Sequence, residues 1–409
     1  MYRNDKKYKL FDLVIWIGTL FICTVLMFVL VYKQASNGEI YHSDIGAYID
    51  EMLGIPTDYS FPYPIMFKTA ALLNKFVWPS LAMSLTVTGF NILALIYTRI
   101  SFRKKTNIGI LATFSTVALF FCSMIYNPLF AKVGIYNRYV GVFTHNAWHN
   151  ATYLASRPFI IGSFIYGAYT MLNYESDFEK AEILTFAKHK NYLIFSLFMF
   201  LVTMTKPAYT LPHMAVVGIV AIYRLLKMKF KNFRQTLCLA LTYVPTLCVL
   251  LYQYAGVFTG TSSRGEDNGI GICLGKVWLN YVSNLPLAII LAAGFPIVVL
   301  LFHIKQLRES EQYRFGWQIY LAGLLMAFFL YEKGFRAMHF NFAWGYICGL
   351  FVVFFVSLEE WCIDIKEAYS EDERFKVNKK LVAETIALLL HLICGVCYFM
   401  SLLNGGDYL

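Results

Sequence analysis

Long apolar segments, separated by short polar ones, dominate the pattern of this chain. A membrane-spanning helix needs about 20 apolar residues, and the runs of that character predict about 11 transmembrane helices. The segments 191–205 and 317–331 are short for a span. The pattern therefore predicts an all-α polytopic membrane protein with one integral-membrane domain, residues 1–409. The predicted spans are 10–32, 80–98, 108–126, 152–174, 191–205, 209–226, 236–255, 285–303, 317–331, 341–358 and 381–403.

Composition supports the same class. The chain is 58% hydrophobic and only 15% charged, too little charge to cover the surface of a soluble protein of 409 residues. Its net charge of +10 is explained by the Lys/Arg bias of membrane proteins, so we expect no nucleic-acid partner. The nine cysteines lie mostly in apolar runs, where a thiol acts as a small hydrophobic group. We expect a multi-pass protein of the plasma membrane.

Basic residues predict the orientation of the chain. Cytoplasmic connections are enriched in Lys and Arg, which places the basic N-terminus in the cytoplasm and the C-terminus outside. The polar connections of unusual composition then all fall on the outer face, and we expect the protein to act there. Those outer segments are 33–79, 126–151, 206–212, 256–284 and 332–340.

The first outer loop, 33–79, predicts amphipathic surface helices. Apolar residues recur at helical spacing after Asp44, and a second amphipathic piece begins at Ile65. Asp44 stands where a helix begins. It is either an N-cap, which satisfies a free backbone N–H group, or a carboxylate at the membrane boundary that takes a proton from a hydroxyl group.

The second outer loop, 126–151, ends in the polar cluster "HNAWHN". Amide and imidazole groups form hydrogen bonds to hydroxyls, and an aromatic face stacks on a sugar ring, so the cluster predicts a sugar-binding site. The two histidines stand at i and i+4 with no adjacent acid, which does not match the HExxH pattern of a zinc hydrolase. We therefore predict no metal ligands here. The sugar-binding candidates are His145, Asn146, Trp148, His149 and Asn150.

Three cations lie close to the predicted outer face: Arg157, Lys206 and Arg336. An ionisable residue within the membrane is costly, and its presence indicates a function. The simplest ligand that the three could share is a phosphate or pyrophosphate, held by charge-assisted hydrogen bonds. Arg336 belongs to a polar stretch, 332–344, that also contains Glu332.

The third outer loop, 256–284, is rich in glycine. It has no P-loop pattern and does not join a strand to a helix, so it does not predict a nucleotide site. Its charged residues Arg264, Glu266 and Asp267 allow two interpretations. The segment is either a plain flexible loop or a lid over an outer site.

The layout resembles the GT-C class of integral-membrane glycosyltransferases. The resemblance lies in the many spans, in the outward-facing basic residues, and in an acid on a surface helix of the first outer loop, here Asp44 in "HSDIGAYID". It implies a polyprenyl-phosphate sugar donor and a catalytic or metal-binding role for Asp44, so a divalent metal cofactor stays open. Two segments, "NAWHNATYLASRPF" and "HFNFAWGY", are also similar to bacterial membrane proteins of surface-polysaccharide synthesis.

The resulting hypothesis is a glycosyltransferase of the outer leaflet that acts in cell-envelope glycan synthesis. Asp44 deprotonates the acceptor, Arg157, Lys206 and Arg336 bind the lipid phosphate, and the cluster at 145–150 binds sugar. Its partners are a lipid-linked sugar donor, a glycan or lipid-linked acceptor, and other envelope-biosynthesis proteins. The alternatives are an O-antigen-type polysaccharide polymerase, a transporter or flippase for a lipid-linked saccharide, and a membrane acyltransferase.

Overall fold

The computed structural model describes residues 6–56, 61–180, 185–258, 269–370 and 378–409. Within these residues the chain is mostly helical. The only strands there, β1 (Ile270–Ile272) and β2 (Leu330–Glu332), are three residues each and pair antiparallel. The prediction of an all-α fold is confirmed.

Every predicted apolar segment contains a helix. The first group comprises α1 (Lys6–Ser36), α2 (Ile45–Leu53), α3 (Ile65–Leu73), α4 (Pro79–Thr106), α5 (Gly109–Phe121), η1 (Pro128–Val133) and α6 (Ala151–Asp177). The middle group comprises η2 (Thr185–Lys188), α7 (Lys190–Thr205), α8 (Thr210–Lys227), α9 (Phe233–Leu241) and α10 (Val244–Phe258). The last comprises α11 (Lys276–Leu279), α12 (Leu285–Phe302), α13 (Gln306–Glu309), α14 (Glu311–Phe329), η3 (Gly334–Arg336), α15 (Ala343–Ser370) and α16 (Lys379–Leu403).

Helix α15 is the centre of the fold. Of its most apolar 18-residue stretch, 94% is buried inside the protein, and it contacts α4, α5, α6, α8, α12, α14 and α16. Its closest approach is to α14, where a Cβ added to Gly323 would lie 2.5 Å from the carbonyl oxygen of Gly345. A Cβ added to Gly349 would lie 2.8 Å from the Cα of Tyr320. The pair Gly345 and Gly349 has the small-xxx-small spacing that lets membrane helices pack backbone to backbone.

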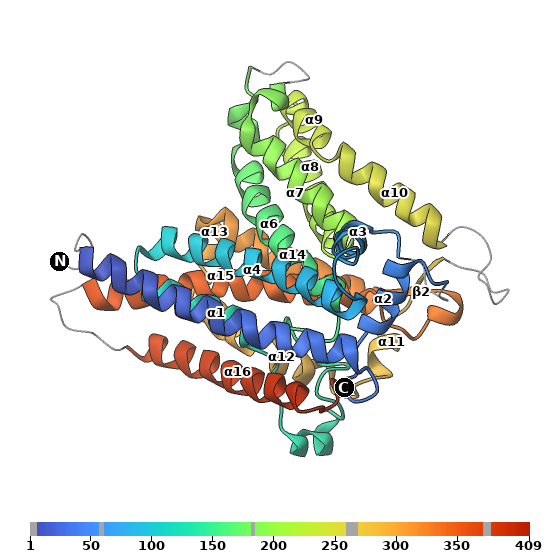
Figure 1. Cartoon of the computed structure of the whole chain (residues 1–409). Helices are drawn as coiled ribbons and strands as arrows, with labels where there is room; N and C mark the ends of the chain where they lie inside the picture. The colour runs from blue at the N-terminus through green and yellow to red at the C-terminus, as the bar shows by residue number, and fades with distance from the viewer. Residues whose placement is uncertain (1–5, 57–60, 181–184, 259–268, 371–377) are drawn as a thin grey trace.

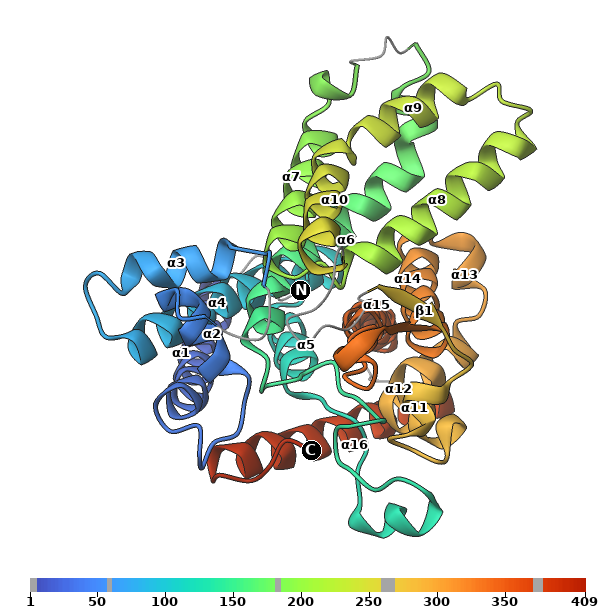
Figure 2. The same ribbon diagram turned by 90° about the vertical axis from the view of Figure 1, so that its right-hand side faces the viewer.

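The helices form two groups that lean away from each other. In Figure 1, α1, α4, α15 and α16 run side by side, whereas α6 to α10 rise from them as a second group, which Figure 2 shows from the side. One end of the set formed by α1, α4, α15 and α16 lies opposite the N-terminus. At this end lie α2, α3, α11, β2 and the C-terminus.

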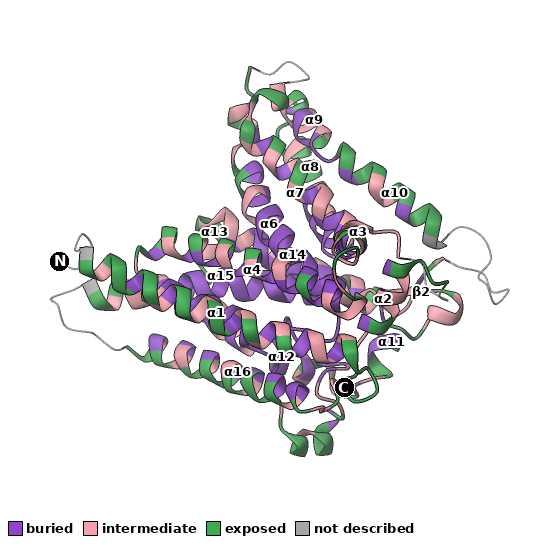
Figure 3. Ribbon diagram, viewed as in Figure 1, coloured by how far each residue is buried: buried purple, intermediate pink, exposed green. Residues whose placement is uncertain are grey.

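Large apolar side chains cover the outside of both groups. Leu10 and Phe21 on α1, Ile219 on α8 and Leu251 on α10 are all more than half exposed, and Figure 3 shows these helices green on their outer faces. A soluble protein rarely exposes apolar surface on this scale. The exposed apolar faces therefore indicate a membrane protein.

The prediction of about 11 spans is not met. Among the described residues, six helices are long and apolar enough to cross a membrane: α1, α4, α8, α12, α15 and α16. The count is seven if α9 and α10, bent by 56°, form one broken span. Helices α5 and α7 have 13 and 16 residues, too short for a hydrocarbon core of about 30 Å at 1.5 Å per residue. Helices α6 and α14 have 27 and 19 residues, but they are not among the helices apolar enough to cross a membrane.

The glycine contact between α14 and α15 yields a stability prediction. Gly323→Ala should lower the free energy of unfolding by about 1–3 kcal/mol, because the new methyl group meets backbone atoms that must move. Thermal unfolding in detergent, followed by circular dichroism, measures the loss. The matched control is Gly218→Ala on α8, where an added Cβ meets nothing within 4 Å. An equal loss in both variants would show that the close approach of α14 and α15 carries no stability.

Candidate functional site

The side chain of Asn150 connects an acid to a base. It is the N-cap of α6, and its Oδ1 accepts a hydrogen bond from the backbone N–H of Tyr153 at 2.9 Å. Its Nδ2 donates to Asp44 Oδ2 at 2.6 Å and to the hydroxyl of Tyr48 at 2.7 Å. Oδ1 also accepts from Lys206 Nζ at 3.1 Å. One buried amide therefore orients a carboxylate on one side and an ammonium group on the other.

Asp44 is not a side-chain cap. It stands at the N-cap position of α2, but its side chain makes no capping hydrogen bond there. Its backbone N–H donates to the carbonyl oxygen of His149 at 3.0 Å, which ties the loop before α2 to the segment before α6. Of the two interpretations that the sequence allowed, the carboxylate that faces a polar site fits the geometry.

Lys206 lies at the break between α7 and α8 and is 7% exposed. Its ammonium group donates to the hydroxyl of Thr152 at 3.1 Å and lies 4.1 Å from the centroid of the Trp344 ring. Burial lowers the pKa of Lys206 to about 8, although the charge of Asp44 opposes that change. An anion bound beside this lysine would stabilise the ammonium form, which burial destabilises.

Asp44, Asn150, Lys206 and Trp344 line one cavity of about 850 Å³. It lies where the loop before α2, the start of α6, the α7–α8 break, the start of α15 and the C-terminus meet. Aromatic rings form much of its wall, including those of Tyr63, Trp344 and Tyr408. The polar and charged lining comprises Asp44, Tyr48, Tyr63, Tyr139, His149, Asn150, Lys206, Gln253, Tyr254, Tyr281, Glu332, Arg336, His339, Asn341 and Tyr408.

Two predicted sugar-binding residues face this cavity, namely Asn150 and His149. The His149 ring stacks on Tyr408 with centroids 4.1 Å apart and meets the edge of Tyr139 at 4.6 Å. Burial lowers the pKa of His149 to about 4, and the nearby Lys206 lowers it further, whereas Asp44 raises it. The ring is therefore neutral near pH 7 and offers a hydrogen bond without charge.

The other three predicted sugar-binding residues are packed inside the protein. His145 lies over Phe354 with ring centroids 3.9 Å apart, and its Nε2 lies 3.2 Å from the carbonyl oxygen of Leu119. Asn146 donates to backbone carbonyls of Leu119 and Cys122 at 2.9 and 2.6 Å. Trp148 packs against Phe399. None of the three is among the residues that line the cavity.

Arg157, predicted to bind phosphate, is also buried away from the cavity. Its guanidinium donates to Asn91 at 3.1 Å and to Asn146 at 2.7 Å. It lies within 6 Å of the ring centroids of Phe120, Trp148, Tyr153 and Phe351. This cation holds the loop before α6 in place through amides and aromatic faces, so the structure separates it from Lys206 and Arg336.

Glu332 is a second acid of the cavity, and the hypothesis drawn from the sequence gave it no role. It ends β2, is 8% exposed, and accepts a hydrogen bond from Asn341 Nδ2 at 2.6 Å. Burial raises its pKa, an effect that Asn341 and Arg336 oppose. The available signal was its position: the polar stretch that contains Arg336 begins with this acid, directly after an apolar run.

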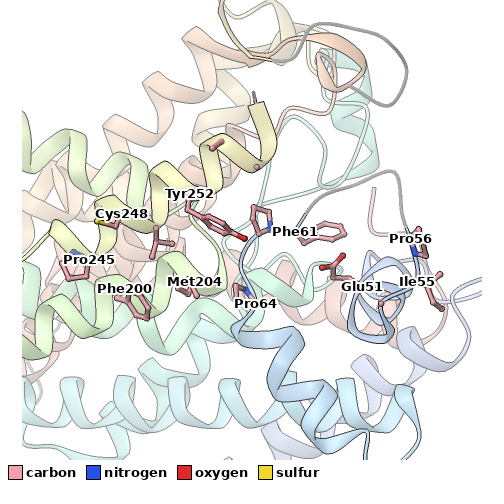
Figure 4. A pocket seen from close by; sticks show the side chains of 15 residues that line it. Glu51, Ile55, Pro56, Phe61, Pro64, Phe200, Met204, Pro245, Cys248 and Tyr252 are labelled. Atoms are coloured by element: carbon pink, nitrogen blue, oxygen red, sulfur yellow. The ribbon is translucent and has the colours of Figure 1, made fainter. Parts of the chain in front are cut away.

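A second cavity of about 1320 Å³ adjoins the first, and its wall is mostly apolar but includes the acid Glu51. Figure 4 shows that Phe200 and Met204 of α7 and Pro245, Cys248 and Tyr252 of α10 form one side of it. Residues at the end of α2 and before α3 form the other side, and Phe61 and Pro62 belong to both cavities. An apolar groove thus leads to the polar site. Of the glycine-rich segment 256–284, the part with Arg264, Glu266 and Asp267 lies outside the described residues.

The combined arrangement can bind an anion beside an apolar chain and can move a proton. Lys206 and Arg336 supply positive charge, Asp44 and Glu332 supply carboxylates, and the groove accepts hydrocarbon. No family model matches the sequence, and no curated protein matches it.

The Asn150 amide yields a prediction on stability. Loss of an N-cap costs about 1 kcal/mol, and Asn150→Ala also removes the partner of Asp44, Tyr48 and Lys206. We expect a loss of free energy of unfolding of about 2–4 kcal/mol, because buried polar groups would lose their partners. The control is Asn284→Ala, which removes the N-cap of α12, whose side chain accepts a hydrogen bond from Leu287. Thermal unfolding should separate the two variants, and equal losses would mean that Asn150 is a cap and nothing more.

Proposed function

We propose that the protein is a membrane glycosyltransferase. It moves a sugar from a polyprenyl-phosphate-type donor to a glycan or lipid-linked acceptor at the outer face of the plasma membrane, in cell-surface glycan synthesis. The observation that supports this most directly is the pairing of Asp44 and Lys206 on the two sides of Asn150. That pair lies in a polar cavity that shares two residues with an apolar groove.

The reaction assigned to this geometry is a single displacement. Asp44 takes the proton of the acceptor hydroxyl as its oxygen bonds to the anomeric carbon of the sugar. The bond from that carbon to the phosphate oxygen breaks, and its electron pair stays on the phosphate. Lys206 and Arg336 stabilise the negative charge that develops on the leaving group.

The apolar groove explains the choice of a lipid-linked donor. A hydrocarbon chain laid along Met204, Val249 and Tyr252 would bring its phosphate towards Lys206, because the groove meets the polar cavity at Phe61 and Pro62. A water-soluble sugar nucleotide has no hydrocarbon chain that could occupy this apolar surface. The groove therefore favours an isoprenoid or similar long-chain phosphate.

In this proposal Arg157, His145, Asn146 and Trp148 support the site without touching substrate, since they do not line the cavity. The sugar would instead contact His149, Asn150, Glu332, Trp344 and Tyr408, which do. Neutral rings and paired amides suit hydroxyl groups, and aromatic faces suit the apolar side of a sugar ring.

A catalytic metal in this cavity does not fit the residues. Among the described residues, the one group of three or more His, Cys, Asp or Glu side chains within coordinating distance contains His303, Asp364 and Glu384. Asp44 and Glu332 are not part of it. The proposed mechanism therefore uses Asp44 as a base.

The first prediction from this proposed mechanism concerns removal of the base, Asp44. Asp44→Asn should lower transfer at least about 100-fold, because a positioned base contributes on the order of 10²–10⁴ to the rate. The purified protein is assayed with short-chain polyprenyl phosphates that carry radiolabelled hexoses, one sugar per reaction, and with extracted lipid-linked glycans as acceptors. The control is Asp50→Asn, which changes an acid of the same helix that does not line the cavity.

The outcomes separate the alternatives. An O-antigen-type polymerase would tolerate Asp44→Asn, so full activity of that variant would refute the role of Asp44. Purified protein that transfers no sugar from any of these donors, yet moves a lipid-linked saccharide across vesicles, would identify a transporter or flippase. Arg157→Ala is not a diagnostic variant, because its buried contacts make a loss of folding the expected result.

The pKa of Lys206 yields the second prediction. A dialkyl phosphate, which keeps one negative charge between pH 6 and 10, should bind about tenfold more weakly at pH 9 than at pH 7. Lys206 titrates at about pH 8, so the ammonium group is mostly present at pH 7 and mostly lost at pH 9. Binding is followed by calorimetry in detergent.

Lys206→Gln is the control for this titration. It should bind the probe weakly at both pH values and show no change between them. The same tenfold loss in Lys206→Gln would assign the titration to another group and would remove Lys206 from the phosphate site.

A further inference from the structure

A second polar cluster lies at the far end of α15 from the cavity. It joins three helices: His303 directly follows α12, Glu360 and Asp364 come from α15, and Glu384 comes from α16. In Figure 1 the end of α15 and the start of α16 lie opposite α2 and β2. Trp344 of the cavity and Asp364 of the cluster are 20 residues apart on α15, roughly 30 Å at the helical rise, close to the thickness of the hydrocarbon core.

The side chains of this cluster converge on one point. His303 Nε2 lies 2.9 Å from Asp364 Oδ2 and 3.3 Å from Glu384 Oε1. His303 Nδ1 lies 3.4 Å from Glu360 Oε2. One nitrogen and two carboxylate oxygens, from His303, Asp364 and Glu384, all lie within 4.8 Å of one another.

The cluster is short of positive charge. Glu360, Asp364 and Glu384 bring three negative charges, and Lys380, 2.8 Å from Asp364, offsets one. Protonated His303 offsets one more and still leaves an excess of negative charge. With His303 neutral, a divalent cation and Lys380 together would balance the three negative charges of the acids.

Glu384 is the observation that points to a ligand. It has no exposed surface. Among the described residues, neither of its carboxylate oxygens accepts a hydrogen bond of good geometry, although Oε1 lies 3.3 Å from Nε2 of His303. A buried carboxylate without hydrogen bonds is costly unless a charge compensates it. The helices α12, α15 and α16 nevertheless bring this group to the centre of the cluster.

We propose that His303, Asp364 and Glu384 bind a divalent transition metal such as Zn²⁺, with Glu360 beside His303 as the further acid. A mixed set of one imidazole and two carboxylates suits such an ion, since imidazole disfavours Mg²⁺ and Ca²⁺. The ion would fasten α12, α15 and α16 together at the end of the membrane domain opposite the cavity. It takes no part in the proposed glycosyl transfer and does not depend on it.

Zinc binding to the full-length, untagged protein in detergent tests the site. After treatment with a chelator and removal of the chelator, wild-type protein should bind about one Zn²⁺ per chain in competition with a chromogenic indicator. Glu384→Gln and His303→Gln should bind at least about tenfold more weakly. Glu309→Gln, which changes an exposed acid on the neighbouring α13, should match wild type. X-ray absorption should show nitrogen and oxygen ligands at about 2.0–2.1 Å and no sulfur.

Two readouts distinguish a metal site from a cluster of ion pairs. With chelator present, Glu384→Gln should unfold at a higher temperature than wild type, because the change removes a buried charge. Saturating Zn²⁺ should raise the melting temperature of wild type and leave that of Glu384→Gln almost unchanged. Equal zinc affinity in wild type and Glu384→Gln, or far less than one Zn²⁺ per wild-type chain, would overturn the proposal. Should Glu384→Gln fail to fold, the wild-type stoichiometry and absorption spectrum decide alone.

Discussion

The cavity depends on one amide. Asn150 accepts the hydrogen bond that starts α6 and at the same time holds Asp44 and Lys206, two opposite charges that would otherwise lack a common partner. Every atom of the amide is used, so neither charge can shift without a cost to the start of α6. The positions of Asp44 and Lys206 are therefore set by the same contacts that fold the start of α6. Arg157 also holds the loop before α6 in place, through its hydrogen bonds to Asn91 and Asn146.

Part of the cavity lining could be picked out from the sequence, because charge is costly in an apolar chain. Asp44, Lys206 and Arg336 stood out against their surroundings, and all three line the cavity. The cluster at 145–150 was harder to interpret. Its amides and rings suit a buried network as well as a sugar, and the choice between these depends on contacts with α5 and α16 that no local pattern reveals. Glu332 was passed over for a similar reason, since its partner Asn341 is visible only in the fold.

The number of spans was overestimated because several apolar segments form helices that are too short, or not apolar enough, to cross a membrane. A helix that is hydrophobic on all sides is either buried in protein or exposed to lipid. Helix α15 is enclosed by other helices, whereas only 22% of the most apolar stretch of α1 is buried. The short helices α5 and α7 bury only part of their apolar surface against neighbours and leave Ile110, Leu193 and Leu197 exposed. The glycines that bring α14 against α15 are ordinary in the sequence, and their purpose appears only when the two backbones meet.

The two polar sites lie at opposite ends of α15, with the cavity at one end and the His303 cluster at the other. The central claim concerns the cavity: a lipid phosphate lies against Lys206 while its chain lies in the apolar groove. An electron-density or cryo-electron-microscopy map of the protein with bound polyprenyl phosphate tests this most directly. We predict the phosphate within about 3 Å of Lys206 Nζ, at charge-assisted hydrogen-bond distance, with the chain along Met204 and Tyr252. A phosphate bound elsewhere, with the cavity at Asp44 and Lys206 unchanged, would contradict the account.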